Sequence, residues 1–186
     1  MMRIITGSAK GLKLKTPRGN AVRPTGDRVK EAVFNILTGL IPDATVADLF
    51  AGTGNLGLEA LSRGAEKAVF VDNSHSSMNL LKENAVRARL ADRAEFLRTD
   101  ALAAISRLQQ DKRIFHLIFC DPPYNRGHVD AVLARIDAAE ILAPDGVVVI
   151  EHSKHEPITA VLQKLQIRRS EHFGETTVSF LRAIRS

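Results

Sequence analysis

The chain has 186 residues, of which 45% are hydrophobic and 25% are charged, and its formal net charge is +5 at pH 7. This is the composition of an ordinary soluble protein, and the length predicts one domain that buries its core without disulfides or metal. A single cysteine excludes an internal disulfide and fits the reducing cytoplasm, and no apolar run is long enough for a membrane span or a signal peptide.

The first thirty residues are strongly basic. They hold one acid, Asp27, against these basic residues: Arg3, Lys10, Lys13, Lys15, Arg18, Arg23, Arg28 and Lys30. Residues 3–6 and 12–16 predict a small hairpin, which a loop containing proline and glycine follows. A patch of this sign attracts phosphates without reading sequence, so a nucleic-acid partner is favoured over a merely solvated basic arm.

From residue 25 onward the pattern indicates alternating helices and strands. Thr25 fits the N-cap of an amphipathic helix over about 26–40. Strands are predicted at 45–50, 67–72, 94–98, 114–120 and 146–151, and helices between them at 55–64, 75–90, 100–109 and 128–138. Strands joined by helices imply right-handed crossovers and a parallel sheet that is covered on both faces.

The C-terminal part breaks this rhythm. A helix is predicted near 156–164, followed by strands at 165–172 and 176–184 that join at Gly174 and must pair antiparallel. The predicted fold class is therefore α/β, a mostly parallel seven-stranded sheet with a C-terminal antiparallel hairpin. We expect one domain over 1–186, in which the basic hairpin and loop (1–24) precede an α/β core (25–186).

A glycine-rich loop follows the first core strand. Gly52, Gly54 and Gly57 allow a sharp turn and a close approach to a ligand at the N-terminus of the next helix. With Asp72 they also satisfy the dinucleotide pattern G-x-G-x-x-G, which leaves an NAD site open. Asp48 at the end of the preceding strand speaks against a dinucleotide, because that position usually stays apolar.

Two further acidic segments follow later strands. Asp100 ends the third strand, well placed for an adenine amine, and Asp121-Pro122-Pro123-Tyr124 follows the fourth. The tetrapeptide offers a carboxylate, rigid carbonyls and an aromatic face, which suit a flat base with an exocyclic amine. Singly, each aspartate is as consistent with a helix cap, and the tetrapeptide with a turn. In this order, at the carboxyl ends of parallel strands, they indicate one ligand site.

These residues resemble S-adenosylmethionine-dependent amino-methyltransferases, whose motif is Asp, Asn or Ser followed by Pro-Pro and an aromatic residue. Arg3-Ile4-Ile5-Thr6-Gly7, Arg23-Pro24-Thr25 with the helix after it, and Asp48-Leu49-Phe50-Ala51-Gly52-Thr53-Gly54 are similar to the RsmD family, and the likeness spans nearly the whole chain. The resemblance implies a class I, Rossmann-like methyltransferase fold. It also implies transfer of a methyl group from S-adenosyl-L-methionine to the N2 amine of one guanine in 16S rRNA, within the bacterial small ribosomal subunit.

The resemblance and the strand positions together assign roles. The target base is expected to contact the tetrapeptide Asp121, Pro122, Pro123 and Tyr124. The expected cofactor contacts are Thr25, Asp48, Phe50, Ala51, Gly52, Gly54, Asp72, Asp100 and Ala101. The expected contacts to rRNA phosphates are Arg3, Lys10, Lys13, Lys15, Arg18 and Arg23. The histidines show no metal-ligand spacing, no metal is required, and no obligate protein partner is evident.

Three alternatives stay open from the residues alone. A DNA methyltransferase acting on adenine N6 or cytosine N4 uses the same tetrapeptide, although this chain shows no added target-recognition domain. An NAD-dependent oxidoreductase rests on the glycine pattern. A basic RNA-binding protein without catalysis predicts RNA affinity but no methyl transfer.

Overall fold

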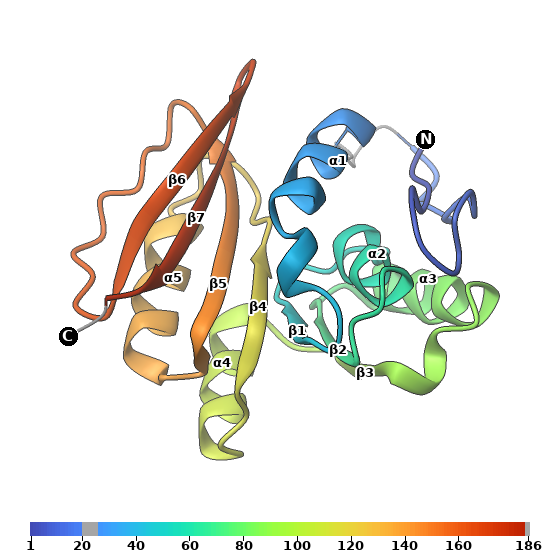
Figure 1. The fold of residues 1–186 in the computed structure, drawn as a ribbon, viewed down its shortest axis with the longest axis horizontal. Coiled ribbons are helices and arrows are strands. Elements are labelled where there is room, and N and C mark those ends of the chain that lie inside the picture. Colours follow the sequence, from blue (N-terminus) through green and yellow to red (C-terminus); the bar gives the residue numbers. More distant parts are fainter. Residues whose placement is uncertain (20–25, 185–186) are drawn as a thin grey trace.

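The computed structural model describes residues 1–19 and 26–184, so the predicted contacts Arg23 and Thr25 lie outside the described residues. A seven-stranded sheet has the order β3-β2-β1-β4-β5-β7-β6 (Figure 1). Its strands are β1 (Thr45–Asp48), β2 (Lys67–Val71), β3 (Ala94–Leu97), β4 (Phe115–Cys120), β5 (Leu142–Ser153), β6 (Leu165–Phe173) and β7 (Thr176–Ala183). β1 to β5 are parallel, and β7 pairs antiparallel with β5 and β6. The predicted sheet is confirmed.

Helices cover both faces of the sheet: α1 (Asp27–Ile36), α2 (Asn55–Ser62), α3 (His75–Arg87), α4 (Ala101–Gln110) and α5 (His128–Ala139). Alternate strand residues point to opposite faces. Val46 and Phe119 therefore join the apolar cluster under α1, α2 and α3, whereas Ala47 and Ile118 join the one under α4 and α5. None of the described helices is long and apolar enough to cross a membrane.

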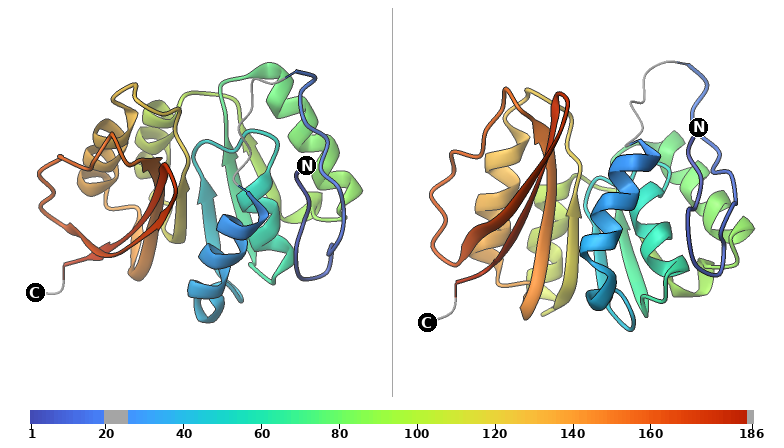
Figure 2. Two further views of the ribbon diagram at one scale, coloured as in Figure 1. Left: turned by 90° about the horizontal axis from the view of Figure 1, so that it is seen from above. Right: turned by 45° about the horizontal axis from the view of Figure 1, so that its top comes forward.

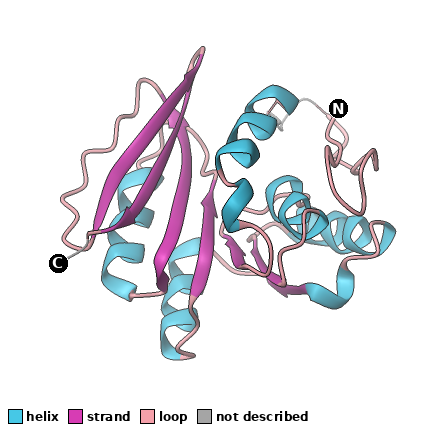
Figure 3. Ribbon diagram, viewed as in Figure 1, coloured by secondary structure: helices cyan, strands magenta, loops and turns pink. Residues whose placement is uncertain are grey.

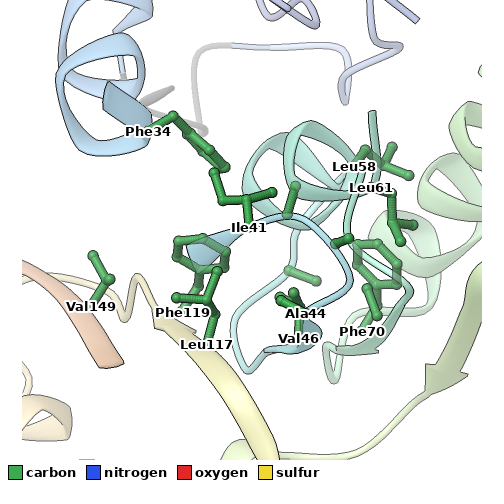
Figure 4. Close-up of a cluster of buried hydrophobic side chains, with 14 of the residues drawn as sticks. Phe34, Ile41, Ala44, Val46, Leu58, Leu61, Phe70, Leu117, Phe119 and Val149 are labelled. Atoms are coloured by element: carbon green, nitrogen blue, oxygen red, sulfur yellow. The ribbon is translucent and has the colours of Figure 1, made fainter. Parts of the chain in front are cut away.

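The packing of α1 shows how tightly this core is closed. Phe34 of α1 lies against Phe119 of β4, with the ring centroids 5.6 Å apart (Figure 4). Both rings are fully buried, and each such aromatic side chain contributes roughly 2–3 kcal/mol through burial alone. This contact anchors α1 beside the end of β4, where the predicted tetrapeptide begins.

The helix predicted near 156–164 is wrong, because these residues form an extended loop between β5 and β6 (Figure 3). Its β-branched residues are weak helix formers, and its backbone amides have other acceptors. Amides of Thr159 and Ala160 donate to Asp130, and those of residues 163–165 donate to Asp137 at 2.8–2.9 Å. Two carboxylates of α5 thus satisfy amides of this segment without a helix.

Two element boundaries differ from the prediction by more than three residues. The helix predicted over 26–40 is interrupted, because α1 ends at Ile36 and a short 3-10 turn (Thr38–Leu40) follows. β5 begins at Leu142, earlier than the predicted 146, since its first residue already pairs with Phe115 of β4. Neither change moves the carboxyl ends of the strands.

The N-terminal arm, residues 1–19, lies beside α2 and α3 (Figure 2). The predicted hairpin is present but short: one antiparallel bridge joins Arg3 and Lys13, and three backbone hydrogen bonds join residues 2–4 to residues 11–14. Side chains of the helices accept further amides of the arm: the Glu59 carboxylate accepts two at 2.9 and 3.0 Å, and Asn84 Oδ1 accepts one at 2.8 Å. The arm is therefore held on the core by buried polar side chains of α2 and α3.

Candidate active site

A cavity of about 630 Å³ opens at the carboxyl ends of the parallel strands, within the usual size range of small-molecule sites. Most of the residues that the sequence predicts for the site line it: Asp48, Phe50, Ala51, Gly52, Asp72, Asp100, Ala101, Asp121, Pro122, Pro123 and Tyr124. They come from the ends of four different strands. The predicted convergence of these segments on one cavity is therefore observed.

Asp48 is the most deeply buried acid of this cavity, with 1% of its surface exposed. The Gly57 amide donates to its Oδ2 at 2.9 Å, while Oδ1 is buried and has no hydrogen-bond partner among the described residues. Burial raises the pKa of Asp48 to about 7, although the Gly57 amide opposes the shift. A buried acceptor without a partner is costly, and a cationic donor in the cavity would satisfy it.

The other two strand-end aspartates are held by backbone amides. Asp72 accepts from the amides of Gly52 and Ser74, each at 2.8 Å, and so ties the glycine loop to the end of β2. Asp100 caps α4 by accepting from the Ala103 amide at 3.0 Å. The helix-cap interpretation therefore holds for Asp100, which also lines the cavity.

Gly54 differs from the other predicted cofactor contacts that the structure describes, because it does not line the cavity. It has a left-handed φ of +99° at the start of α2, where a side chain is strained. A Cβ here would lie 2.5 Å from Leu81 and 2.7 Å from Leu58. The turn and the close packing of α2 on α3 therefore explain why this position is a glycine.

The tetrapeptide lies directly after β4. Pro122 is buried and Asp121 is half-buried. The Tyr124 hydroxyl donates to Glu151 Oε1 at 2.6 Å and lies 2.8 Å from Thr176 Oγ1, and burial with the Glu151 hydrogen bond raises the pKa of Tyr124. The ring is therefore fixed by β5 and β7, elements far from it in sequence.

A family model described as conserved hypothetical protein 95 matches residues 2–182. Ribosomal RNA small subunit methyltransferase D of Escherichia coli (strain K12) is 32% identical over 174 residues, which cover 94% of this chain and 86% of that protein. The chain belongs to the RsmD family.

Two further relatives support this membership. YlbH of Bacillus subtilis (strain 168) is 38% identical over 178 residues, covering 96% of this chain and 97% of YlbH. The solved structure of yhhF from Escherichia coli has a TM-score of 0.85 and 29% identity, over 98% of this chain and 97% of that one. The class I, Rossmann-like methyltransferase fold that the RsmD resemblance implies is confirmed.

Several residues that line the cavity of this RsmD-family protein were not predicted from the sequence. They are Met2, Leu49, Thr53, Asn55, Leu56, Asn73, Thr99, Leu102, His128, Ala131, Val132 and Glu151. Most are neighbours of predicted residues, so widening each motif by one or two positions would have found them. Met2 and Glu151 carry no local signal, because the arm and β5 reach the cavity only through the tertiary fold.

Asn55 belongs to a buried polar cluster beneath the cavity. Lys30, fully buried, donates to Asn55 Oδ1 at 2.9 Å and pairs with Glu59 Oε2 at 3.1 Å. Burial lowers the pKa of Lys30, although Glu59 opposes the shift. Since Glu59 also binds the arm, this cluster connects the arm to the start of α2.

The predicted RNA contacts that the structure describes lie on the arm: Arg3, Lys10, Lys13, Lys15 and Arg18, all exposed. Arg3 pairs with Asp27 at 2.9 Å, and Lys15 pairs with Glu83. Exposed pairs of this kind are weak, so an anion can compete for both cations. The arm thus presents its basic side chains outward while its backbone is bound to the core.

Proposed function

We propose that this chain transfers a methyl group from S-adenosyl-L-methionine to the N2 amine of a guanine in 16S rRNA of the bacterial small ribosomal subunit. Relatives from Escherichia coli and Haemophilus influenzae are named as small-subunit rRNA methyltransferases, which supports the substrate class. The observation that carries the proposal is the shared cavity. It joins the amine-accepting tetrapeptide to the glycine loop and three strand-end aspartates.

The donor set of the cavity fits the proposed cofactor. The Oδ1 of Asp48, to which no described residue donates, suits the ammonium of the methionine part, because a charged donor offsets the cost of burying that oxygen. Asp72 at the end of β2 suits the ribose hydroxyls, and Asp100 with Ala101 the adenine. The bound sulfonium supplies an activated methyl group that departs without further activation.

The chain's own contribution is to hold the amine. The N2 lone pair of guanine is delocalised into the ring, so the nitrogen is a poor nucleophile until its hydrogens are held by acceptors. Asp121 and the Pro122 carbonyl are suited to accept them, and the two prolines pre-set the backbone because their φ is fixed. Tyr124 stacks on the base. The proton released after transfer passes to the Asp121 carboxylate or to water.

Positioning is the main source of rate in this proposal. Asp121→Ala should therefore lower methyl transfer to small ribosomal subunits by roughly 100-fold or more, while S-adenosylhomocysteine binding, followed by calorimetry, stays near normal. Transfer of labelled methyl at a near-normal rate by this variant would remove Asp121 from the mechanism. Absence of transfer by the unaltered protein to any RNA, with the cofactor bound, would reject the function.

The DNA methyltransferase alternative differs in its target base. It predicts transfer to adenine or cytosine in DNA, and the same labelled assay with duplex and single-stranded DNA tests it. The exposed basic arm favours a polyanion in either case, since phosphates are common to both. The RsmD-family membership favours RNA.

A further inference from the structure

We infer that Glu151 selects guanine at this site by accepting a hydrogen bond from its ring N1–H, beside the amine that Asp121 holds. This inference rests on the proposed function and adds the residue that would distinguish guanine from adenine and cytosine. Glu151 lines the same cavity as Asp121 but belongs to β5. It lies outside the tetrapeptide motif.

The sheet register brings the two carboxylates together. In the parallel pair β4 and β5, Cys120 is opposite Ile150. The next residues, Asp121 and Glu151, therefore follow at neighbouring positions toward the carboxyl ends of these strands. Adjacent strands lie about 4.8 Å apart. Cys120 and Ile150 both face the cluster under α4 and α5, and the next position along β5 alternates away from it.

Glu151 is held in place on one side. Its Oε1 accepts from the Tyr124 hydroxyl at 2.6 Å, and Thr176 lies 2.8 Å from the same hydroxyl. A carboxylate has about four lone-pair positions, so a side chain of this type accepts from more than one donor. Since Tyr124 is the proposed stacking residue, the bond also sets the carboxylate at the rim of the base.

The three bases differ in the hydrogen-bonding group that lies beside the amine. Guanine presents its amine beside the N1–H, so two adjacent positions of its edge donate hydrogen bonds. Adenine and cytosine present the amine beside a ring nitrogen that accepts. Two neighbouring carboxylates complement the guanine edge, whereas the second carboxylate would face a lone pair on either other base. A polar site of this kind rejects a mismatched analogue strongly.

The experiment compares two target bases that share the 2-amino group. Small subunits are reconstituted from 16S rRNA carrying, at the methylated position, guanine or 2-aminopurine, whose N1 accepts instead of donating. The unaltered protein should prefer guanine by roughly 100-fold in kcat/KM. Glu151→Gln should lower this ratio to about tenfold or less, because the glutamine amide can donate to N1 of 2-aminopurine.

Thr176→Val serves as the matched control. It removes the second partner of the Tyr124 hydroxyl but leaves the Glu151 carboxylate, so the preference for guanine should persist even if the rate falls. Binding of S-adenosylhomocysteine, measured by calorimetry, should be the same in all three proteins.

Two results would overturn the inference and leave the proposed function intact. The first is an equal loss on both bases in Glu151→Gln, which would reduce Glu151 to a support for Tyr124. The second is equal use of both bases by the unaltered protein. No methylation of the guanine subunit by the unaltered protein would instead reject the proposed function itself.

Discussion

At the residue scale, the acids at the carboxyl ends of the strands differ in the groups that already donate hydrogen bonds to them. Asp72 and Asp100 are satisfied by backbone amides, so they shape the cavity even before any ligand arrives. Asp48 keeps one buried oxygen without a partner among the described residues. It is therefore the acid whose environment should change most when a cation enters.

This difference predicts a pH dependence of cofactor binding. Burial raises the pKa of Asp48 to about 7, above its value of about 4 in the unfolded chain. The free energy of unfolding therefore falls as pH rises from about 4 to 7, because over this range the unfolded chain has lost a proton that the folded protein still holds. A bound ammonium favours the ionised form. The ionised fraction grows roughly tenfold from pH 6 to pH 8, and S-adenosylhomocysteine affinity should grow with it.

Calorimetry at the two pH values measures this directly. Asp48→Asn should bind more weakly, and its affinity should no longer change over this range. If the variant keeps the same rise in affinity, the titrating group is another one and Asp48 does not contact the ammonium.

At the element scale, the loop between β5 and β6 depends on α5. Asp137 is buried, with 8% exposed, and accepts two amides of the loop and the amide of Leu165, where β6 begins. Asp130 accepts two amides and the Thr159 hydroxyl at a more exposed position. Asp137→Asn should lower the free energy of unfolding by about 2–3 kcal/mol, because the buried amides lose a charged acceptor.

The matched variant is Asp130→Asn, which should cost less, about 1 kcal/mol or below, since solvent can replace its bonds. Urea unfolding of both variants measures the difference. Equal losses would mean that burial does not govern the strength of these bonds.

The same loop also supports the segment after the tetrapeptide. Glu156 accepts the amides of Asn125 and Gly127 at 2.6 and 3.1 Å, so it pins the turn that leads from Tyr124 into α5. A helix over 156–164 would have placed this carboxylate differently. The irregular loop is thus part of what positions the candidate site.

Much of the fold was predictable from local pattern. The strand-end acids Asp48, Asp72 and Asp100 were found because each ends an apolar run and is followed by a turn or helix signal. Glu151 was not, because its partner Tyr124 is 27 positions away and β5 ends without a motif. The helix predicted at 156–164 failed for the same reason, since Asp130 and Asp137 compete for its amides from a distant element.

At the scale of the whole molecule, buried polar residues connect the basic arm to the cavity. Glu59 binds arm amides and the buried Lys30, and Lys30 binds Asn55 at the cavity. Met2, the second residue of the arm, lines the cavity itself. RNA held by the arm would therefore lie next to the site of transfer.

This arrangement predicts where salt-sensitive RNA affinity resides. Replacing Lys10, Lys13 and Lys15 by alanine should weaken binding to 16S rRNA and reduce the slope of log affinity against log salt by about 2, because phosphate contacts release counterions. Filter binding at several salt concentrations measures the slope.

Two exposed lysines at the amino ends of the strands, opposite the cavity, provide the control. Lys67 begins β2 and Lys112 precedes β4, at the amino ends of the strands. Replacing both should leave the slope nearly unchanged. A slope that falls by the same amount per lysine removed in both variants would mean that net charge, and not the arm, governs binding.

The most direct test of the central claim is the identity of the methylated nucleoside. Small ribosomal subunits from a strain lacking this activity are incubated with the protein and labelled S-adenosyl-L-methionine, and the rRNA is digested to nucleosides. We expect N2-methylguanosine at one site, dependent on Asp121. Label in N6-methyladenosine or N4-methylcytidine, or none in the rRNA, would contradict it.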